Sequence, residues 1–132
     1  RLYGYSFQQN NCQFAVVHSL DGYDEISLTS EFKVLGQNSE SIYTPEQLHF
    51  KRCQEADLDG GNTPEEAARI FDNVLNNRAT EAQRNCVIAN SAFAIQVIEP
   101  DKKIEECIAI ATESLDSGRA RQTLEKFIEI NQ

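Results

Sequence analysis

The chain of 132 residues lacks methionine and tryptophan altogether. It begins with Arg1, and a chain without methionine has no initiator of its own, so we expect a segment of a longer protein or a processed product. No apolar stretch approaches the roughly 20 residues that a helix needs to cross a bilayer. Nothing in the chain resembles a signal peptide either. These absences argue against an integral membrane protein.

Basic side chains are also scarce. The chain has 12 lysines and arginines against 21 aspartates and glutamates, which gives a net charge of -9. A nucleic-acid-binding protein neutralises phosphates with basic side chains, and an anionic membrane surface attracts them, so we expect neither partner. The apolar fraction of 40% and the charged fraction of 25% are typical of a soluble globular protein, which we expect to be cytoplasmic.

Paired cysteines are missing. The four cysteines, Cys12, Cys53, Cys86 and Cys107, are widely spaced and form no CxxC pair, so the sequence gives little support to a zinc site. Cys86 and Cys107 lie among apolar residues with helical periodicity, which is typical of small core residues. We expect reduced thiols. Two disulfides are the alternative and would need an oxidising compartment.

The order of predicted elements is a short helix, a strand, a hairpin and then about four helices. The first ten residues read as the end of a helix, and residues 13–18 form a continuous apolar run. Such a run suits a strand buried on both faces, as in a parallel sheet covered by helices. Residues 26–43 show alternating polarity around a turn at 36–39, which predicts an antiparallel excursion.

Helix start signals divide the remaining residues. Thr63 precedes a proline and has a glutamate three residues later, and Thr80 with Gln83 forms a second capping box. Pro100 and Asp101 predict the start of a third helix, and Ser117-Gly118 separates it from an amphipathic last helix. The fold class is therefore α/β. One strand of the buried type needs neighbours that this chain does not contain, which again indicates a segment of a larger domain.

An acidic motif follows the apolar strand directly. Asp21-Gly22-Tyr23-Asp24-Glu25 carries three carboxylates, two of them adjacent in sequence. Neighbouring carboxylates repel each other unless a positive group compensates them. Oxygen ligands just past a strand end suit Mg²⁺ shared with a phosphate substrate, at the edge where open α/β sheets bind ligands. From the residues alone, a solvated acidic loop is the alternative.

The motif and its context resemble a known family. Val16-Val17-His18, followed by residues 21–29, is similar to the carboxyl-terminal metal motif of the anthranilate phosphoribosyltransferases. The likeness continues through residues 43–46, 60–61, 85–95, 104–108 and 115–120, and so covers nearly the whole chain. The resemblance implies a nucleoside-phosphorylase-like phosphoribosyltransferase, in which a small helical domain and a larger α/β domain enclose the active site.

The activity that this resemblance implies is transfer of phosphoribose from phosphoribosyl pyrophosphate to anthranilate, a step of tryptophan biosynthesis. Asp24 and Glu25 match the acidic pair that holds Mg²⁺ against the pyrophosphate in this family. We assign no catalytic acid or base, because the uncharged aromatic amine of anthranilate is already a usable nucleophile. A non-catalytic acidic α/β binding module and a related nucleoside phosphorylase are the alternatives.

Several features of the family are absent from this chain. These are its Gly-Thr-Gly-Gly-Asp phosphate loop, its Lys-His-Gly segment and the arginine that receives the anthranilate carboxylate. We therefore expect residues 1–132 to be the carboxyl-terminal segment of one α/β domain, without the amino-terminal helical domain and the phosphate-loop half. Such a segment would need the remainder of the same polypeptide, would dimerise through the missing helical domain, and would be inactive alone.

Other polar residues have simpler interpretations. We expect His18 to bond backbone at the strand end rather than to act in catalysis, and His49 to be a packing residue. Gly60-Gly61 predicts a tight turn, although a phosphate could also approach such a pair at a helix start. Asp21 is expected to be structural. Asn90 lies in an apolar helix, where a buried amide needs partners, so it caps or bridges neighbouring elements, and its role stays open.

Overall fold

The computed structural model describes residues 2–10 and 12–132 and gives an α/β architecture, as predicted. Within them no helix is long and apolar enough to cross a membrane. The elements, in chain order, are α1 (Leu2–Gln9), β1 (Ala15–Ser19), β2 (Phe32–Gly36), β3 (Glu40–Tyr43), the 3₁₀ turns η1 (Pro45–Leu48) and η2 (Glu55–Leu58), α2 (Pro64–Leu75), α3 (Glu81–Ile98), α4 (Ile104–Asp116) and α5 (Arg119–Ile130).

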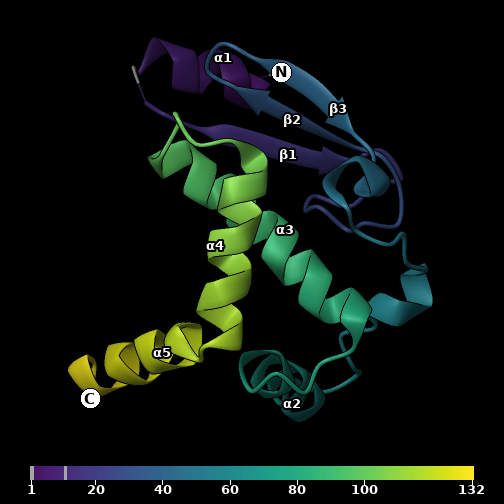
Figure 1. Cartoon of the computed structure of the whole chain (residues 1–132), viewed down its shortest axis with the longest axis vertical. Coiled ribbons are helices and arrows are strands. Elements are labelled where there is room, and N and C mark those ends of the chain that lie inside the picture. The colour runs from purple at the N-terminus through teal and green to yellow at the C-terminus, as the bar shows by residue number, and fades with distance from the viewer. Residues whose placement is uncertain (1, 11) are drawn as a thin grey trace.

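The three strands form one antiparallel sheet in the order β1-β2-β3 (Figure 1). Val17 of β1 pairs with Val34 of β2, and Phe32 of β2 pairs with Tyr43 of β3. The predicted hairpin is confirmed for its strands, but the residues before Phe32 form an irregular loop. β1 is largely half-buried rather than buried on both faces. It is an edge strand of this sheet, and its only strand partner among the described residues is the antiparallel β2.

The core lies between the sheet and α3 and includes the buried face of α4. Alternate residues of a strand point to opposite faces, and Phe32 and Val34 of β2 are both buried. The ring of Phe32 meets Phe93 of α3 edge-on, with ring centroids 5.8 Å apart. On the other face of β2, Leu35 lies so close to α1 that a Cβ on Gly4 would come within 2.5 Å of its Cδ2. The sheet is thus covered by α3 on one face and by α1 on the other (Figure 1).

Local capping explains where the helices begin. Thr80 and Gln83 form the predicted capping box at the start of α3, with each side chain accepting from the other residue's backbone N–H at 3.3 and 3.2 Å. Thr63 caps α2 by accepting from Glu66 N–H at 3.2 Å, but the Glu66 carboxylate accepts from Asn62 N–H instead of from Thr63 N–H, so only half of the predicted capping box forms. α4 begins at Ile104, three residues after the predicted Asp101, because Lys103 is its N-cap and Glu106 accepts from the Lys103 N–H.

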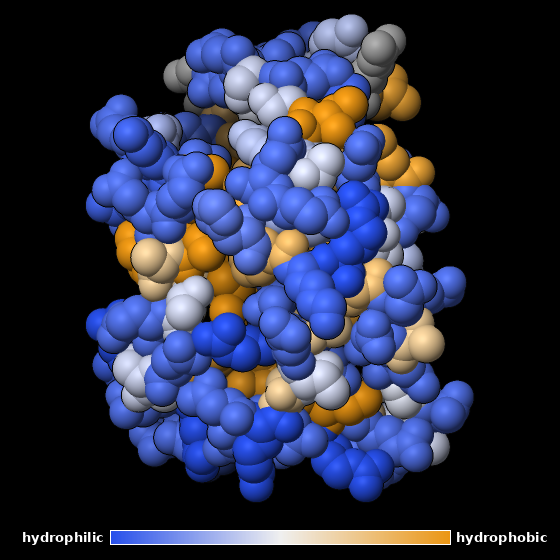
Figure 2. Space-filling model, turned by 45° about the vertical axis from the view of Figure 1, so that its right-hand side comes forward, coloured by the Kyte–Doolittle hydropathy of each residue, from blue (hydrophilic) through white to orange (hydrophobic). Residues whose placement is uncertain are grey.

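The last helix leaves most of its large apolar side chains in solvent. α5 follows α4 after Gly118, at a φ of 79°, and extends away from the sheet (Figure 1). The side chain of Phe127 is 64% exposed, and no residue of α5 is buried. Elsewhere the surface is mostly polar, with separate hydrophobic areas on the face drawn in Figure 2. The predicted amphipathic helix is confirmed, but within the described residues its apolar side is covered only in part, at Ala120 and Leu124.

Replacing Phe32 by alanine tests the sheet-to-helix core. Phe32 is fully buried, so Phe32→Ala should lower the free energy of unfolding by about 3–5 kcal/mol in urea titrations followed by circular dichroism. Phe127→Ala is the matched control on an exposed ring and should change the same quantity by less than about 0.5 kcal/mol. Equal losses in the two variants would contradict this placement of the core.

Candidate metal centre

Asp24 and Glu25 lie in the loop between β1 and β2, which we call the acidic loop (residues 20–31). Both side chains are exposed and make no hydrogen bond or ion pair with the residues that the structure describes. The loop turns sharply after β1, where Ser19 N–H donates to the Tyr23 carbonyl at 3.0 Å and Gly22 has a φ of 110°. The described residues hold no cluster of three or more His, Cys, Asp or Glu side chains that could bind a metal. The pair thus provides two protein carboxylates and no third one.

A row of hydroxyl groups supports the acidic loop from within. The Ser19 hydroxyl donates to the Glu25 carbonyl at 2.8 Å and accepts from Ser27 N–H at 3.1 Å. Ser27 Oγ lies 3.0 Å from Ser19 Oγ and 2.6 Å from Thr29 Oγ1, and its one proton serves one of these contacts. The Thr29 hydroxyl donates to Asp21 Oδ2 and lowers the pKa of that carboxyl. Asp21 is therefore structural, as predicted.

Asn90 of α3 joins the acidic loop to the helix. Its Oδ1 accepts from Ile26 N–H at 3.0 Å, and its Nδ2 donates to the Ile26 carbonyl at 2.9 Å. Nδ2 also donates to the Cys86 carbonyl one turn earlier in α3, again at 2.9 Å. Of the two roles left open for Asn90, the bridging one is confirmed.

Two thiols hold the next peptide of the loop. Cys86 Sγ donates to the Ser27 carbonyl at 2.7 Å, and Cys53 Sγ donates to the same oxygen at 3.4 Å. Burial raises the pKa of Cys86 to about 12 and also raises the pKa of Cys53, so both thiols stay protonated donors at neutral pH. Cys53 N–H donates to the carbonyl of Leu28, a buried residue with a φ of 61°.

The two histidines differ from their predicted roles. His18 is exposed on β1, and its imidazole makes no hydrogen bond within residues 2–10 and 12–132, so the expected backbone partner is not found. His49 is exposed and does not pack. It ends η1 with a φ of 61°, and this left-handed turn directs it outward while Leu48 and Phe50 on either side are buried.

The tight turn predicted at Gly60-Gly61 is confirmed. Gly61 has a φ of 83°, and its N–H donates to Asp59 Oδ1 at 2.9 Å. A Cβ on Gly61 would lie 2.6 Å from the Cβ of Glu66, so only glycine fits. The Glu66 carboxylate accepts from Asn62 N–H at 2.7 Å and so occupies the place where a phosphate could otherwise approach this helix start.

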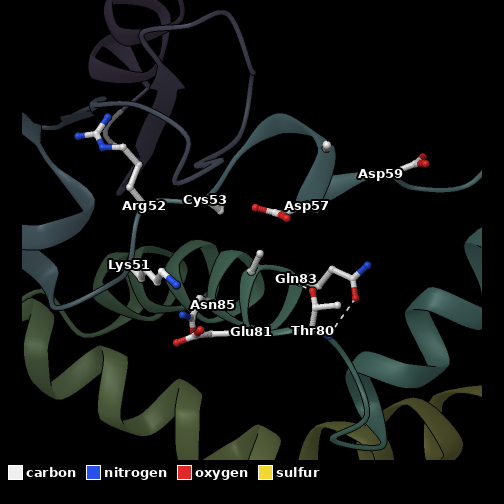
Figure 3. Close-up of a pocket in the computed structure, with 11 residues that line it drawn as sticks. Lys51, Arg52, Cys53, Asp57, Asp59, Thr80, Glu81, Gln83 and Asn85 are labelled. Carbon is white, nitrogen blue, oxygen red and sulfur yellow. Dashed lines mark hydrogen bonds between the residues drawn. The ribbon is translucent and has the colours of Figure 1, made fainter.

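Two cavities lie near the acidic loop. One, of about 570 Å³, is mostly apolar and lies between α2 and α3, with Phe71 and Val87 in its wall and Glu25 at its edge. The other, of about 430 Å³, lies between residues 51–59 and the first turn of α3 (Figure 3). Several of its polar side chains already serve the fold: Asp57 accepts from Gln54 N–H at 2.8 Å, and Thr80 and Gln83 cap α3. We assign no ligand to either cavity.

Arg52 completes the support of the acidic loop at its far end. It points away from the other labelled side chains in Figure 3 and donates to the Thr29 carbonyl at 3.3 Å. Its Nε and Nη2 donate to the two oxygens of Glu46 at 3.1 and 3.3 Å, and this contact lowers the pKa of Glu46. Because its guanidinium is already bonded to Glu46 and to the Thr29 carbonyl, Arg52 is not available to bind a ligand.

Most of the chain matches one protein family. A family model described as "Glycosyl transferase family, a/b domain" matches residues 7–121. The chain belongs to this family. The match includes the acidic loop and all of α3 and α4, so the elements that build the candidate metal centre are family elements.

Similar members of the glycosyl transferase family carry one name. The anthranilate phosphoribosyltransferase of Bacteroides thetaiotaomicron is 67% identical over 131 residues, which are 99% of this chain and 40% of that protein. The enzyme of the same name from Phocaeicola vulgatus is 59% identical over 131 residues, again 99% of this chain and 40% of that protein. The resemblance predicted from the acidic motif is confirmed, and the chain spans about 40% of the length of these relatives.

Solved structures agree on the fold. The anthranilate phosphoribosyltransferase of Thermus thermophilus superposes with a TM-score of 0.86 at 26% identity, over 96% of this chain and 38% of that one. The Saccharomyces cerevisiae enzyme in complex with phosphoribosyl pyrophosphate and Mg superposes with a TM-score of 0.79 at 23% identity, over 89% of this chain and 33% of that one. The predicted fold class is confirmed.

Thiol reactivity tests the arrangement of the cysteines. Cys12 is exposed, whereas Cys53 and Cys107 are buried and Cys86 is half-buried. Burial raises the pKa of these last three thiols, so less thiolate forms at pH 8 than at an ordinary cysteine. We expect one thiol to react quickly with Ellman's reagent and three to react only on unfolding in guanidinium. Cys12→Ser should abolish the fast phase, and a second fast thiol would contradict the burial.

Proposed function

We propose that the chain is the carboxyl-terminal segment of the α/β domain of an enzyme that transfers phosphoribose from phosphoribosyl pyrophosphate to anthranilate, in tryptophan biosynthesis. In this proposal Asp24 and Glu25 hold Mg²⁺. The observation that carries it is an exposed, unpaired carboxylate doublet on a loop whose backbone is held from several sides. The names of the relatives, and of the solved complex with phosphoribosyl pyrophosphate and Mg, support the same reaction.

The donor set fits a magnesium ion. Mg²⁺ takes oxygen ligands, keeps several waters, and is usually held by one or two carboxylates together with substrate phosphates. The described residues offer two free carboxylates at this place and no further acidic or imidazole ligand beside them. Phosphate oxygens and water would therefore complete the coordination, so metal and substrate would bind together.

In the proposed reaction this segment holds the metal ion and supplies no acid or base. At the ribose C1 the bond to pyrophosphate oxygen breaks, a bond to the amine nitrogen forms, pyrophosphate leaves with the electron pair, and the amine loses a proton. Bound Mg²⁺ supplies neutralisation of the charge that develops on the leaving oxygens. Asp24 and Glu25 would hold the ion, and no residue of this chain is assigned to proton transfer.

The remaining parts of the site are proposed to come from outside this chain. In this proposal a phosphate loop and an arginine for the anthranilate carboxylate would lie in a further part of the polypeptide, since this chain spans only 40% of the length of its relative. Dimerisation through a helical domain and a cytoplasmic location are parts of the same proposal. We use the term full-length enzyme for a polypeptide that joins this chain to that additional part.

Removing the two charges tests the metal assignment. In the full-length enzyme, Asp24→Asn/Glu25→Gln should weaken Mg²⁺-dependent binding of phosphoribosyl pyrophosphate by at least about 10–100-fold, because even outer partners of a metal site contribute that much. Isothermal titration calorimetry with and without Mg²⁺ measures it. Glu31→Gln, an exposed acid of the same loop, is the matched control and should bind as the unmodified enzyme does. Unchanged binding in the double variant would rule out the assignment.

The isolated chain gives a second test. We expect residues 1–132 alone to consume no anthranilate in the presence of phosphoribosyl pyrophosphate and Mg²⁺, because the chain lacks the phosphate loop. The full-length enzyme under identical conditions is the positive control. Turnover by the purified chain without any other polypeptide would refute this division of the site.

A further inference from the structure

We infer that Asn90 is a positioning residue for the acidic pair: its amide fixes the peptide that follows Glu25 and so sets the direction of both carboxylates. The inference rests on the proposed role of Asp24 and Glu25. Neither carboxylate makes a hydrogen bond or ion pair with the described residues, so the backbone is what fixes the point from which each side chain leaves the loop.

The peptide between Glu25 and Ile26 is held at both of its polar ends. Its carbonyl, which belongs to Glu25, accepts from the Ser19 hydroxyl at 2.8 Å. Its N–H, which belongs to Ile26, donates to Asn90 Oδ1 at 3.0 Å. Ser19 ends β1 and Asn90 lies in α3, so two separate elements fix the plane of one peptide. A peptide plane that is fixed in this way limits the rotation of the residue that precedes it.

The amide of Asn90 cannot turn freely to lose this contact. One of its two N–H groups donates to the Ile26 carbonyl and the other to the Cys86 carbonyl, both at 2.9 Å. The second contact ties the amide to its own helix. Since both donors are used, Oδ1 must face Ile26 N–H, and every hydrogen-bonding group except one acceptor lone pair is engaged.

The helix that carries Asn90 is a firm support. Ala89 and Ala92 are fully buried and Phe93 is 3% exposed. The residues of α3 directly before and shortly after Asn90 are therefore packed in the core. The first turn of α3 is closed by the Thr80 capping box. Functional groups need support from elements that are themselves held by packing, and α3 meets this condition.

Loss of the amide would leave the Ile26 N–H and carbonyl without partners in a place where Ile26 is 1% exposed. Unpaired buried backbone groups are costly, so the loop would shift to reach water and would carry Glu25 with it. A role in metal positioning therefore predicts an effect on Mg²⁺ dependence. A role in packing alone predicts lower stability without that effect.

The test uses the full-length enzyme with Asn90→Ala and, should that variant not fold, Asn90→Asp, which keeps the size and one acceptor but loses both donors. Gln96→Ala is the matched control, because it removes a side-chain to backbone bond of the same helix, from Nε2 to the Lys102 carbonyl at 3.2 Å. Two readouts are compared: hydrogen–deuterium exchange of residues 19–30, and the Mg²⁺ concentration that half-saturates phosphoribosyl transfer.

We expect Asn90→Ala to raise the half-saturating Mg²⁺ concentration about tenfold, at the low end of the effect of outer metal partners, with KM for anthranilate unchanged. Exchange should rise in residues 19–30 and stay constant in α4, and Gln96→Ala should alter neither readout in this way. A Mg²⁺ requirement equal to that of the unmodified enzyme would overturn the positioning role. An unmodified enzyme that needs no Mg²⁺ would instead overturn the proposed function.

Discussion

A buried loop without regular structure must find a hydrogen-bond partner for each of its backbone groups, and this requirement shapes the whole region around the acidic pair. Ile26, Ser27 and Leu28 are at most 4% exposed, yet they belong to no helix or strand. Their partners come from the end of β1, from the segment at Cys53 and from two residues of α3. The acidic pair stands in solvent because the residues directly after it are held in the core.

The same partners connect parts of the chain that are far apart in sequence. Asn90 lies 64 positions from Ile26, and Cys86 lies 59 positions from Ser27. The sheet, α3 and the connection between η1 and η2 all meet at this loop. The candidate site is therefore the junction of the elements rather than an addition to one of them.

Local signals in the sequence predicted most of the fold. The capping boxes, the glycine between α4 and α5, and the alternation in the hairpin strands depend on neighbours within a few residues, and the structure agrees with them. Burial was predicted less well. The apolar run of β1 and the apolar side of α5 suggest buried elements, but burial depends on what covers an element, and that cannot be read from the element itself. His49 shows the same limit, since a single left-handed residue reversed its direction.

For the site, the motif predicted the loop and the exposed pair, whereas its supports were predicted only in part. Ser27 and Thr29 stand two residues apart in the sequence, which is a weak signal by itself. Nothing in the sequence around Cys53 indicates that its thiol reaches Ser27, because that contact spans 26 positions. Asn90 stands out in the sequence as a polar residue in an apolar helix, and the structure supplies its partner.

Leu28 combines two demands that few amino acids meet together. Its φ of 61° lies in the region that glycine adopts most easily, while its side chain is 1% exposed in the core. Glycine would relieve the backbone but leave a void, and valine or isoleucine would add branching at Cβ where it is least tolerated. Position 28 should therefore accept few residue types, and a substitution there would also shift the nearby carboxylates of Asp24 and Glu25.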